Sequence, residues 1–594
     1  MERHILVALA LTLNGACIGE QAIGTQGDAL ADTSDTPDDA APDDTTPDDT
    51  SPEDTSPDDT SPDDTSPVDV RPDLEDTGDT GACAPVVYPA TPSTVLTSEG
   101  PVAGAVDDGV TRWLGIPYAA PPIGPLRFRQ PAPPPCRSEV LAPLLAQPCP
   151  QRAGGALVGD EDCLTLNIWA PSNAQSAPVL VFFHGGGHIQ GSAVETLIGG
   201  GLLYDGQHLA RTQGVVVVTV QYRLGALGWL VHPALSAEDD SGPIGNRGLL
   251  DQQAALRWLS AHLELFGGDP SRVTIFGESA GAVDTSLHVA MPSSAGLFSA
   301  AIVQSGSPVA RPLDTALNQG MDAVAQSPCG AAPDIAVCLR GLTTEALLTA
   351  LPGQIGIGSP GIGMGGGNFG PVLDGRLIPA APLSLLRTPR DNAPTVIVGS
   401  NTEEMAELFV QQVSTEAAYL QALRVGIAAP IAFVAGETTD EVLAAILAVY
   451  PLSAYASPQL AIEDVYTDLR FTCPGVELLR ALEAGGHPTR RYLFARRLVT
   501  ANGERPASHG IELPFVFGSW RNIPLYQPAP ADRLLSDQMM SAWATLGTTI
   551  PELGDGWPEW SAELGRTLIL DGPLALANAP REDRCAFWRS FTSP

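Results

Sequence analysis

The stretch VTIFGESAG, from Val273 to Gly281, places a serine where a catalytic nucleophile would stand. A run of mostly β-prone residues leads into Gly-Glu-Ser-Ala-Gly, and the helix-like stretch SAGAVDTSLHVAM begins at the serine. In a G-x-S-x-G turn between a strand and a helix, the serine projects above the sheet at the positive end of the helix, and the glycines let neighbouring backbone approach closely. We therefore predict that Ser279 is a nucleophile.

A glycine run upstream of Ser279 could stabilise the negative charge that such a nucleophile generates. The stretch FFHGGGHIQG ends a predicted strand and contains three glycines, Gly185 to Gly187. In hydrolases with a G-x-S-x-G turn, backbone N–H groups of such a run form an oxyanion hole with the N–H of the residue after the serine, here Ala280. The alternative is that the glycines form only a flexible turn.

A general base should come from a histidine late in the chain, because the order in these hydrolases is Ser, acid, His. Among the nine histidines, only His487 and His509 lie late. The stretch RRYLFARRLV predicts a strand, which His487 precedes and His509 follows. Active sites of parallel sheets form at the C-terminal ends of their strands. We therefore predict that His509 is the base and that His487 lies in a surface turn.

The third member of such a site is an acid that orients the histidine and stabilises its charged form. The stretch APTVIVGSN predicts another late strand, and TEEMAELF follows its end. This places Glu403 and Glu404 at the same edge of the sheet as His509. Spacing alone does not choose between them, and the unused carboxylate would simply favour a helix start.

The elements around these residues predict the fold class. VLVFFHGGG and GVVVVTVQYR have the pattern of buried strands, whereas GLLDQQAALRWLSAHLELFGG has the apolar spacing of a helix that ends in glycines. Strands that alternate with helices indicate an α/β domain built on a large, mostly parallel central sheet with helices on both faces. We predict that this domain extends over residues 83–594.

The charge and composition exclude several functions. The formal net charge is -37, which disfavours binding to nucleic acid phosphates or to an anionic membrane surface. All 31 basic residues are arginine. The absence of lysine excludes Schiff-base chemistry, a Walker A phosphate loop and an S-x-x-K nucleophile.

The N-terminal region has the composition of an export signal followed by a linker. A basic start, the apolar run ILVALALTL and the small residues NGAC predict a signal peptide over residues 1–16. After cleavage, Cys17 would either carry a lipid anchor, as in bacterial lipoproteins, or be lost with plain secretion. Residues 17–82 repeat units such as SPDDT, and we predict an acidic, disordered linker because this segment has little apolar surface to bury.

Several longer segments resemble the type-B carboxylesterase family, which includes the cholinesterases. The similarity begins at about Val102 and reaches the C-terminus, and it rests on LGIPYAAPPIGPLRF, EDCLTLNIWAP, FGESAGA, QYRLGALGWL and SAGLFSAAIVQSGS. The resemblance implies an α/β-hydrolase fold and a serine ester hydrolase that acts on small-molecule esters through an acyl-enzyme, without a metal or organic cofactor. It leaves the oligomeric state open.

The resemblance also assigns roles to individual residues. The family's acid segment corresponds to GSNTEEM, which selects Glu404 over Glu403, although Met405 replaces the usual glycine. His509, in HGIELPFVFG, corresponds to the family's histidine. His188 stands where the family usually has an aromatic residue. The remaining matches are the oxyanion donors Gly186, Gly187 and Ala280, and two positions that support the site, Glu278 and Ser305.

The cysteines fit an exported member of this family. The chain has nine cysteines, and disulfides are expected in an oxidising compartment. Cys83 and Cys136 have no family counterpart and could pair with each other. The resemblance implies three bridges, namely Cys149 with Cys163, Cys329 with Cys338, and Cys473 with Cys585.

The loop between the first family cysteines bears on the substrate. Cholinesterases carry a tryptophan there that binds a quaternary ammonium by cation–π attraction. Here the loop is only PQRAGGALVGDED, without an aromatic residue. We therefore expect a neutral alkyl or aryl ester rather than a choline ester. Two alternatives are a binding or adhesion module that lacks esterase activity and a lipase that needs an interface.

Overall fold

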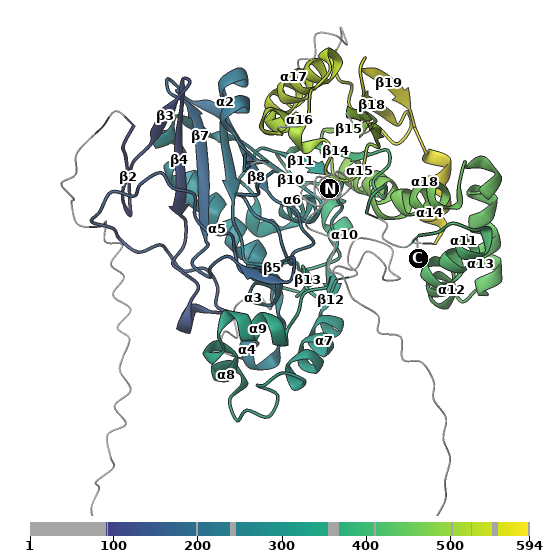
Figure 1. Ribbon diagram of the computed structural model, residues 1–594, viewed down its shortest axis with the longest axis horizontal. Helices are drawn as coiled ribbons and strands as arrows, with labels where there is room; N and C mark the ends of the chain where they lie inside the picture. The colour runs from purple at the N-terminus through teal and green to yellow at the C-terminus, as the bar shows by residue number, and fades with distance from the viewer. Residues whose placement is uncertain are drawn as a thin grey trace, which may run out of the picture. The chain divides into compact units, whose positions relative to one another are not determined.

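The structure is a computed structural model of the 594-residue chain (Figure 1). It describes residues 83, 91, 93–197, 200–237, 245–354, 367–408, 412–500, 503–523, 526–548 and 556–591. The predicted signal peptide (residues 1–16) and linker (residues 17–82) lie outside the described residues. The predicted domain boundary at residue 83 therefore stays a prediction.

An 11-stranded mixed sheet forms the centre of the domain. Every pairing from β9 to β18 is parallel. The pairings outside this region are antiparallel. From one edge to the other, the strands are β19 (Ala575–Asn578), β18 (Arg566–Leu570), β15 (Thr489–Phe494), β14 (Thr395–Asn401), β11 (Ala300–Gln304), β10 (Gly268–Glu278), β8 (Ala177–Phe183), β9 (Val216–Val220), β7 (Thr165–Pro171), β4 (Val110–Pro117) and β3 (Ala105–Asp107).

The predicted α/β fold with a large, mostly parallel sheet is confirmed, and the antiparallel edges add to it. Strands β3 and β4 are joined by the two-residue turn Asp108-Gly109, in which φ is 45° and 76°. Positive φ at both central residues is typical of the tight turns that connect antiparallel neighbours. The tight turn therefore makes β3 and β4 antiparallel, whereas helical crossover connections make the central strands parallel.

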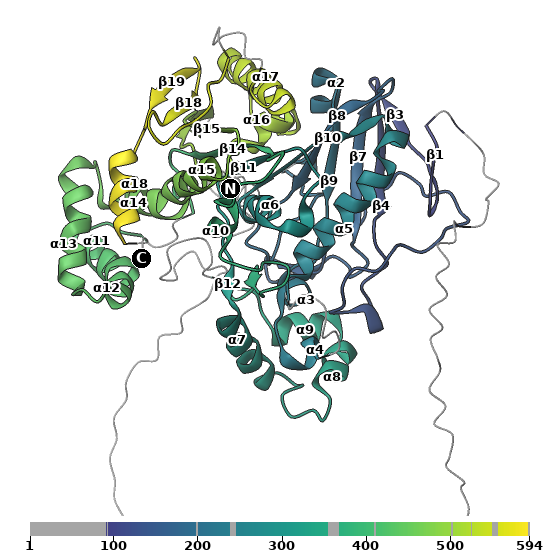
Figure 2. The same ribbon diagram turned by 180° about the vertical axis from the view of Figure 1, so that it is seen from behind.

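Side chains alternate across β8 into two separate cores. Val179, Val181 and Phe183 belong to one core, whereas Leu180 and Phe182 belong to the other. This period of two is what a strand covered on both faces requires. The first core includes residues of α5 (Arg247–His262) and α6 (Ala280–Ala290), and the second includes residues of α2 (Gln207–Gln213), α16 (Leu513–Phe517) and α17 (Pro530–Thr545) (Figure 2).

Further helices and short two-stranded sheets complete the described part of the domain. The other α-helices are α3 (Gly225–Trp229), α4 (Pro233–Ser236), α7 (Leu313–Ala325), α8 (Ile335–Gly341), α9 (Thr344–Ala350), α10 (Pro382–Leu386), α11 (Glu416–Leu423), α12 (Ala429–Ala435), α13 (Thr439–Val449), α14 (Pro458–Thr467), α15 (Cys473–Ala484) and α18 (Glu582–Ser590). The short sheets pair β1 (Val95–Thr97) with β2 (Gly100–Val102), β5 (Gln151–Ala153) with β6 (Ala156–Val158), β12 (Arg311–Pro312) with β13 (Val372–Leu373), and β16 (Leu498–Thr500) with β17 (Gly503–Arg505).

One continuous helical segment, Glu416–Ala435, is long and apolar enough by length and composition to cross a membrane. Its side chains Tyr419, Leu423 and Ile427 are buried in the first core. These contacts pack one side of the segment against the rest of the domain. Phe433 and Val434, near its end, are exposed.

Four disulfides crosslink the domain, including one between Cys83 and Cys136. The other three join Cys149 to Cys163, Cys329 to Cys338, and Cys473 to Cys585. They indicate an extracellular or otherwise exported protein, because such bridges persist in oxidising compartments.

The disulfides differ in the length of chain that they close, and this predicts different contributions to stability. Cys473 and Cys585 are 112 positions apart, whereas Cys329 and Cys338 are 9 apart. Loop-closure entropy predicts that replacing the first pair with alanine lowers the free energy of unfolding by about 5 kcal/mol, and replacing the second by about 3 kcal/mol. Denaturant unfolding of the two double variants measures this difference, and an equal or reversed order would contradict it.

Candidate active site

Ser279 lies in a sharp turn between β10 and α6. Its φ is 57° and its ψ is -121°, in a region of backbone space that side chains other than glycine rarely adopt and that costs conformational energy. The flanking glycines make this turn fit. A Cβ atom on Gly277 would meet the carbonyl oxygen of Gly281, and a Cβ atom on Gly281 would meet that of Phe183. The G-x-S-x-G pattern is therefore a packing requirement at this position.

The glycine run Gly185 to Gly187 follows the end of β8 and faces this turn. A Cβ atom on Gly185 would lie 2.7 Å from Glu278 Oε2 and 3.0 Å from Ser279 Cβ. Gly186 and Gly187 have φ values of 109° and 63°, and within the described chain their N–H groups donate to no acceptor. Ala280 is the first residue of α6, so its N–H has no partner within the helix. These backbone donors are available to a developing anion.

His509 and Glu404 form a buried pair. His509 Nδ1 lies 2.7 Å from Glu404 Oε2, and Glu404 is fully buried. The other carboxylate oxygen of Glu404 accepts hydrogen bonds from Ser305 Oγ at 2.5 Å and from the Asn401 N–H at 2.6 Å. The carboxylate is thus held from both sides, and it orients the imidazole through Nδ1.

The second ring nitrogen of His509 faces the residue before the serine. His509 Nε2 lies 3.0 Å from Glu278 Oε1, although this oxygen has no aligned hydrogen-bond donor among the described residues. Ser279 donates its backbone N–H to Gln304 O at 3.0 Å, but its hydroxyl makes no hydrogen bond within the described chain. The structure therefore brings His509 to the Ser279 turn without a direct hydrogen bond between the two side chains.

Comparison with known proteins agrees with this geometry. A sequence model of the carboxylesterase family matches residues 91–588. The chain belongs to this family. The carboxylesterase is 34% identical over 490 residues to the fumonisin B1 esterase of Sphingopyxis macrogoltabida, covering 78% of this chain and 84% of that enzyme. It is 31% identical over 548 residues to the acetylcholinesterase of Bungarus fasciatus, covering 84% of this chain and 86% of that enzyme.

A solved structure described as a PNB esterase resembles the carboxylesterase over 84% of this chain and 100% of that one. The TM-score is 0.70 and the sequence identity is 31%. The predicted family, the α/β-hydrolase fold and the ester hydrolase activity are therefore confirmed.

The two candidate acids occupy different surroundings in the carboxylesterase. Glu403 pairs with Arg497, which is about half exposed, and accepts a hydrogen bond from the Ala507 N–H at 3.1 Å. Glu404 is the carboxylate that contacts His509. These contacts therefore distinguish Glu404, which lies against His509, from Glu403, which does not. The spacing in the sequence left this choice open.

The expectation that His487 lies in a surface turn is wrong. Its side chain is buried, and Nδ1 lies 3.0 Å from Pro394 O, because the turn packs against the segment that precedes β14. His487 also precedes β15, so it lies at the opposite end of the parallel strands from His509.

Three buried glutamates surround the imidazole. Burial lowers the pKa of His509, but the nearby carboxylates of Glu278 and Glu404 outweigh this effect and raise it. Burial raises the pKa of Glu278, which the positive charge on His509 partly offsets. Burial, followed by the Glu404 charge, also raises the pKa of Glu512. The site therefore holds a proton on His509 to higher pH than a free histidine would.

This electrostatic arrangement predicts the pH profile of activity. A base must be neutral to accept a proton, so kcat/KM should rise as pH passes upward through the raised pKa of His509. Glu278→Gln removes one carboxylate that raises this pKa. We expect the acidic limb of the kcat/KM profile to move to lower pH by on the order of one unit.

The matched control for this prediction is Glu437→Gln, because Glu437 is exposed on the surface. Its profile should coincide with that of the wild type. An acidic limb that stays in place or moves to higher pH in Glu278→Gln would contradict the assignment of the raised pKa to Glu278.

Two hydrogen-bonded groups were not predicted from the sequence. Asn401 Nδ2 donates to Glu512 Oε2 at 2.7 Å, and Gln304 Nε2 donates to Glu512 Oε1 at 3.1 Å. Glu512 lies three residues after His509 in HGIELPFVFG, in the turn that precedes α16, and this closeness in the sequence was the only signal available for it. These hydrogen bonds hold the carboxylate of Glu512 in place next to the segment that carries Glu404.

The second hydrogen-bonded group that the sequence did not predict is centred on His188, the residue after the glycine run. His188 Nε2 lies 2.8 Å from Asp284 Oδ1, and Asp284 is fully buried on α6. Gln252 Nε2 donates to the other oxygen of Asp284 at 2.7 Å. Where the family usually has an aromatic residue, this chain therefore has an ionisable pair that ties the glycine run to the helix after Ser279.

Proposed function

We propose that the carboxylesterase hydrolyses neutral alkyl or aryl esters by two-step acyl transfer, with Ser279 as nucleophile, His509 as base and Glu404 as the acid that orients it. The observation that carries this proposal is the convergence of a serine in a strained turn, a histidine held by a buried carboxylate, and unpaired backbone N–H groups. Each group has the chemistry that one step of ester hydrolysis requires.

In the first step, His509 removes the proton from the Ser279 hydroxyl, which attacks the ester carbonyl. The Nε2 atom is available for this task because Glu404 occupies Nδ1. Catalytic hydrogen bonds often form only when the substrate is bound, so the present contact of Nε2 with Glu278 does not exclude the route. Displacement of Glu278 Oε1 by the serine hydroxyl would complete the triad.

The tetrahedral intermediate is stabilised by the N–H groups of Gly186, Gly187 and Ala280, each worth about 3 kcal/mol in the transition state. The alcohol then leaves with the proton held on His509. In the second step, the same base activates a water molecule that hydrolyses the acyl-enzyme. Ser305 Oγ and the Asn401 N–H donate hydrogen bonds to one carboxylate oxygen of Glu404, which fixes the other oxygen against His509.

The short loop between Cys149 and Cys163 supports the substrate class. It forms the β5–β6 hairpin and contains no aromatic residue, so it offers no ring for a quaternary ammonium. Because a cation–π contact contributes up to about 2 kcal/mol where it is present, and this hairpin provides none, we expect butyrylthiocholine to show no kcat/KM advantage over a neutral thioester of the same acyl chain.

Parallel assays of butyrylthiocholine and S-propyl thiobutyrate with a thiol reagent test this prediction. A kcat/KM at least about 10-fold higher for the choline thioester than for the neutral thioester would contradict it. A panel of p-nitrophenyl esters of rising chain length then tests the proposed activity itself, and a rate that jumps above the solubility limit of the ester would indicate a lipase instead.

We also propose that the chain is exported by its N-terminal signal and that the acidic linker carries the esterase domain away from its attachment or cleavage point. Mass spectrometry of the mature N-terminus distinguishes an acylated Cys17 from signal-peptide cleavage without lipidation.

A further inference from the structure

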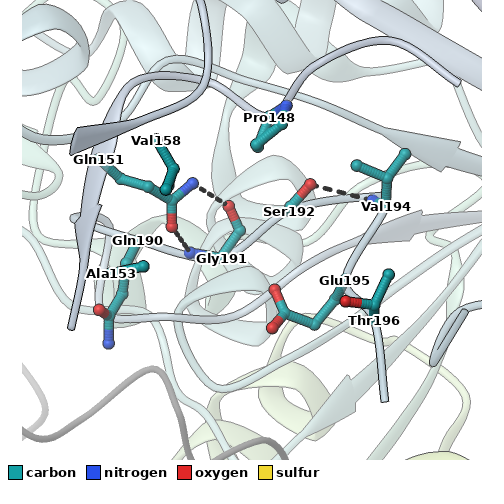
Figure 3. Close-up of a pocket in the computed structure, with 10 residues that line it drawn as sticks. All are labelled: Pro148, Gln151, Ala153, Val158, Gln190, Gly191, Ser192, Val194, Glu195 and Thr196. Atoms are coloured by element: carbon teal, nitrogen blue, oxygen red, sulfur yellow. Dashed lines mark hydrogen bonds between the residues drawn. The ribbon is translucent and has the colours of Figure 1, made fainter. Parts of the chain in front are cut away.

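A cavity of about 330 Å³ lies beside the glycine run (Figure 3). The β5–β6 hairpin forms one wall, and the segment from Gln190 to Thr196 forms the other. Gln151 joins the two walls, because its side chain accepts a hydrogen bond from the Gly191 N–H at 2.7 Å and donates one to Gly191 O at 2.8 Å. The volume is within the range of small-molecule sites.

One carboxylate in this cavity has no described partner. Glu195 lines the cavity, and Figure 3 shows its carboxylate pointing toward the side formed by Gly191. No residue in the described chain donates a hydrogen bond to it or forms an ion pair with it, and burial raises its pKa to about 7. Glu195 is partly buried, and a ligand that supplies a hydrogen-bond donor and a positive charge would pair with its carboxylate.

The remaining lining restricts the chemistry of that ligand. None of the described lining residues is basic, so the cavity offers no positive charge to an anion. None is aromatic, so it offers no cation–π contact to a quaternary ammonium. Pro148, Val158 and Val194 provide apolar walls suited to an alkyl chain. A protonated primary or secondary amine on a short chain fits best, because its N–H groups can bond to the carboxylate.

The cavity lining and the glycine run of the active site belong to one continuous segment of the chain. A Cβ atom on Gly186 would meet the carbonyl oxygen of Gln190, so a proposed oxyanion donor packs directly on the cavity wall. The buried phenol of Tyr204 is within electrostatic range of both sites: burial raises its pKa, and the charges of Glu195 and then Glu278 raise it further.

We propose that this cavity binds a primary or secondary ammonium group carried by the ester substrate, with Glu195 as the residue that selects it. The inference rests on the proposed function and extends it: besides neutral esters, the enzyme accepts esters that carry such an ammonium group, and it prefers them. Glu195 acts here on binding and takes no part in the acyl transfer.

Binding of n-butylammonium to the full chain carrying Ser279→Ala tests the site independently of hydrolysis. We expect calorimetry to detect butylammonium, and n-butanol, its uncharged counterpart, to bind at least about 10-fold more weakly. Adding Glu195→Gln should weaken butylammonium binding at least about 10-fold. Glu195→Leu, which also removes the charge, should give the same loss and serves as the test if Glu195→Gln does not fold. Glu139→Gln, at an exposed glutamate, should leave the affinity unchanged.

Kinetics with matched esters tests whether the amine belongs to the substrate. One pair carries a terminal amine or a methyl group on the acyl chain, and a second pair carries it on the alcohol. In at least one pair we expect the amine ester to have the higher kcat/KM, and Glu195→Gln should lower the ratio of the two kcat/KM values at least about 10-fold. No amine preference in either pair, or a preference that survives Glu195→Gln, would overturn the inference.

The two proposals fail in different ways. If butylammonium binds equally well with and without Glu195 while Ser279→Ala abolishes hydrolysis, the amine site is wrong and the proposed function stands. If Ser279→Ala still hydrolyses esters while binding depends on Glu195, the proposed mechanism is wrong and the amine site stands.

Discussion

Ser279→Ala is expected to lower kcat/KM for a p-nitrophenyl ester by about 10⁴- to 10⁶-fold, because removing the nucleophile of such a triad leaves only the stabilisation that the oxyanion donors and substrate binding provide. Alanine keeps a Cβ atom, so the strained backbone at this turn is unchanged and the fold should be retained. Steady-state hydrolysis, with thermal melting as a check on folding, measures the effect.

A matched control for this variant lies on the same helix. Ser286 is buried on α6, and its hydroxyl donates only to Val283 O at 2.7 Å. Ser286→Ala should therefore change kcat/KM by no more than a few-fold. If both serine variants lost activity equally, or if Ser279→Ala kept most of its activity, the nucleophile would have to be sought elsewhere.

Glu404→Gln has the second-largest expected effect, a fall in kcat of about 10⁴-fold, as expected when the acid of a triad becomes an amide. The amide cannot both accept the His509 Nδ1–H and keep the hydrogen bonds from Ser305 and Asn401. The imidazole would then lose both its orientation and the carboxylate that stabilises its charged form. The measurement is single-turnover acylation by a p-nitrophenyl ester, which isolates the chemical step from product release.

Glu403→Gln is the control that separates the two adjacent carboxylates. Glu403 pairs with a half-exposed arginine, and such surface pairs contribute about 0–1 kcal/mol to stability. We expect kcat to change less than about threefold in this variant. A comparable loss in both variants would show that the region tolerates no substitution and would remove the support for Glu404 as the orienting acid.

The sequence predicted the parts of this carboxylesterase that depend on local backbone chemistry. The turn at Ser279 could be located because Gly277 and Gly281 have no space for a side chain. The central strands could be located because they are covered on both faces and are therefore apolar throughout. Likewise, the position of His509 after a strand placed it at the C-terminal edge of the sheet.

Features that depend on which side chains meet across the fold could not be predicted in the same way. Choosing between Glu403 and Glu404 from the residues alone failed, because burial and the approach of Arg497 are tertiary properties. The pairing of His188 with Asp284 joins residues 96 positions apart, with no local signal in either segment. Two antiparallel pairings, β3 with β4 and β18 with β19, depend on short turns that the helix–strand alternation does not report. The other two, β4 with β7 and β7 with β9, join strands far apart in the sequence.

The most direct test of the central claim is to react the full chain with a fluorophosphonate probe and to map the adduct by mass spectrometry. The account predicts one adduct, on the peptide that contains Ser279, formed in proportion to the loss of esterase activity and absent from Ser279→Ala. Esterase activity that persists without an adduct at Ser279, or an adduct on a different residue that tracks the loss of activity, would contradict it.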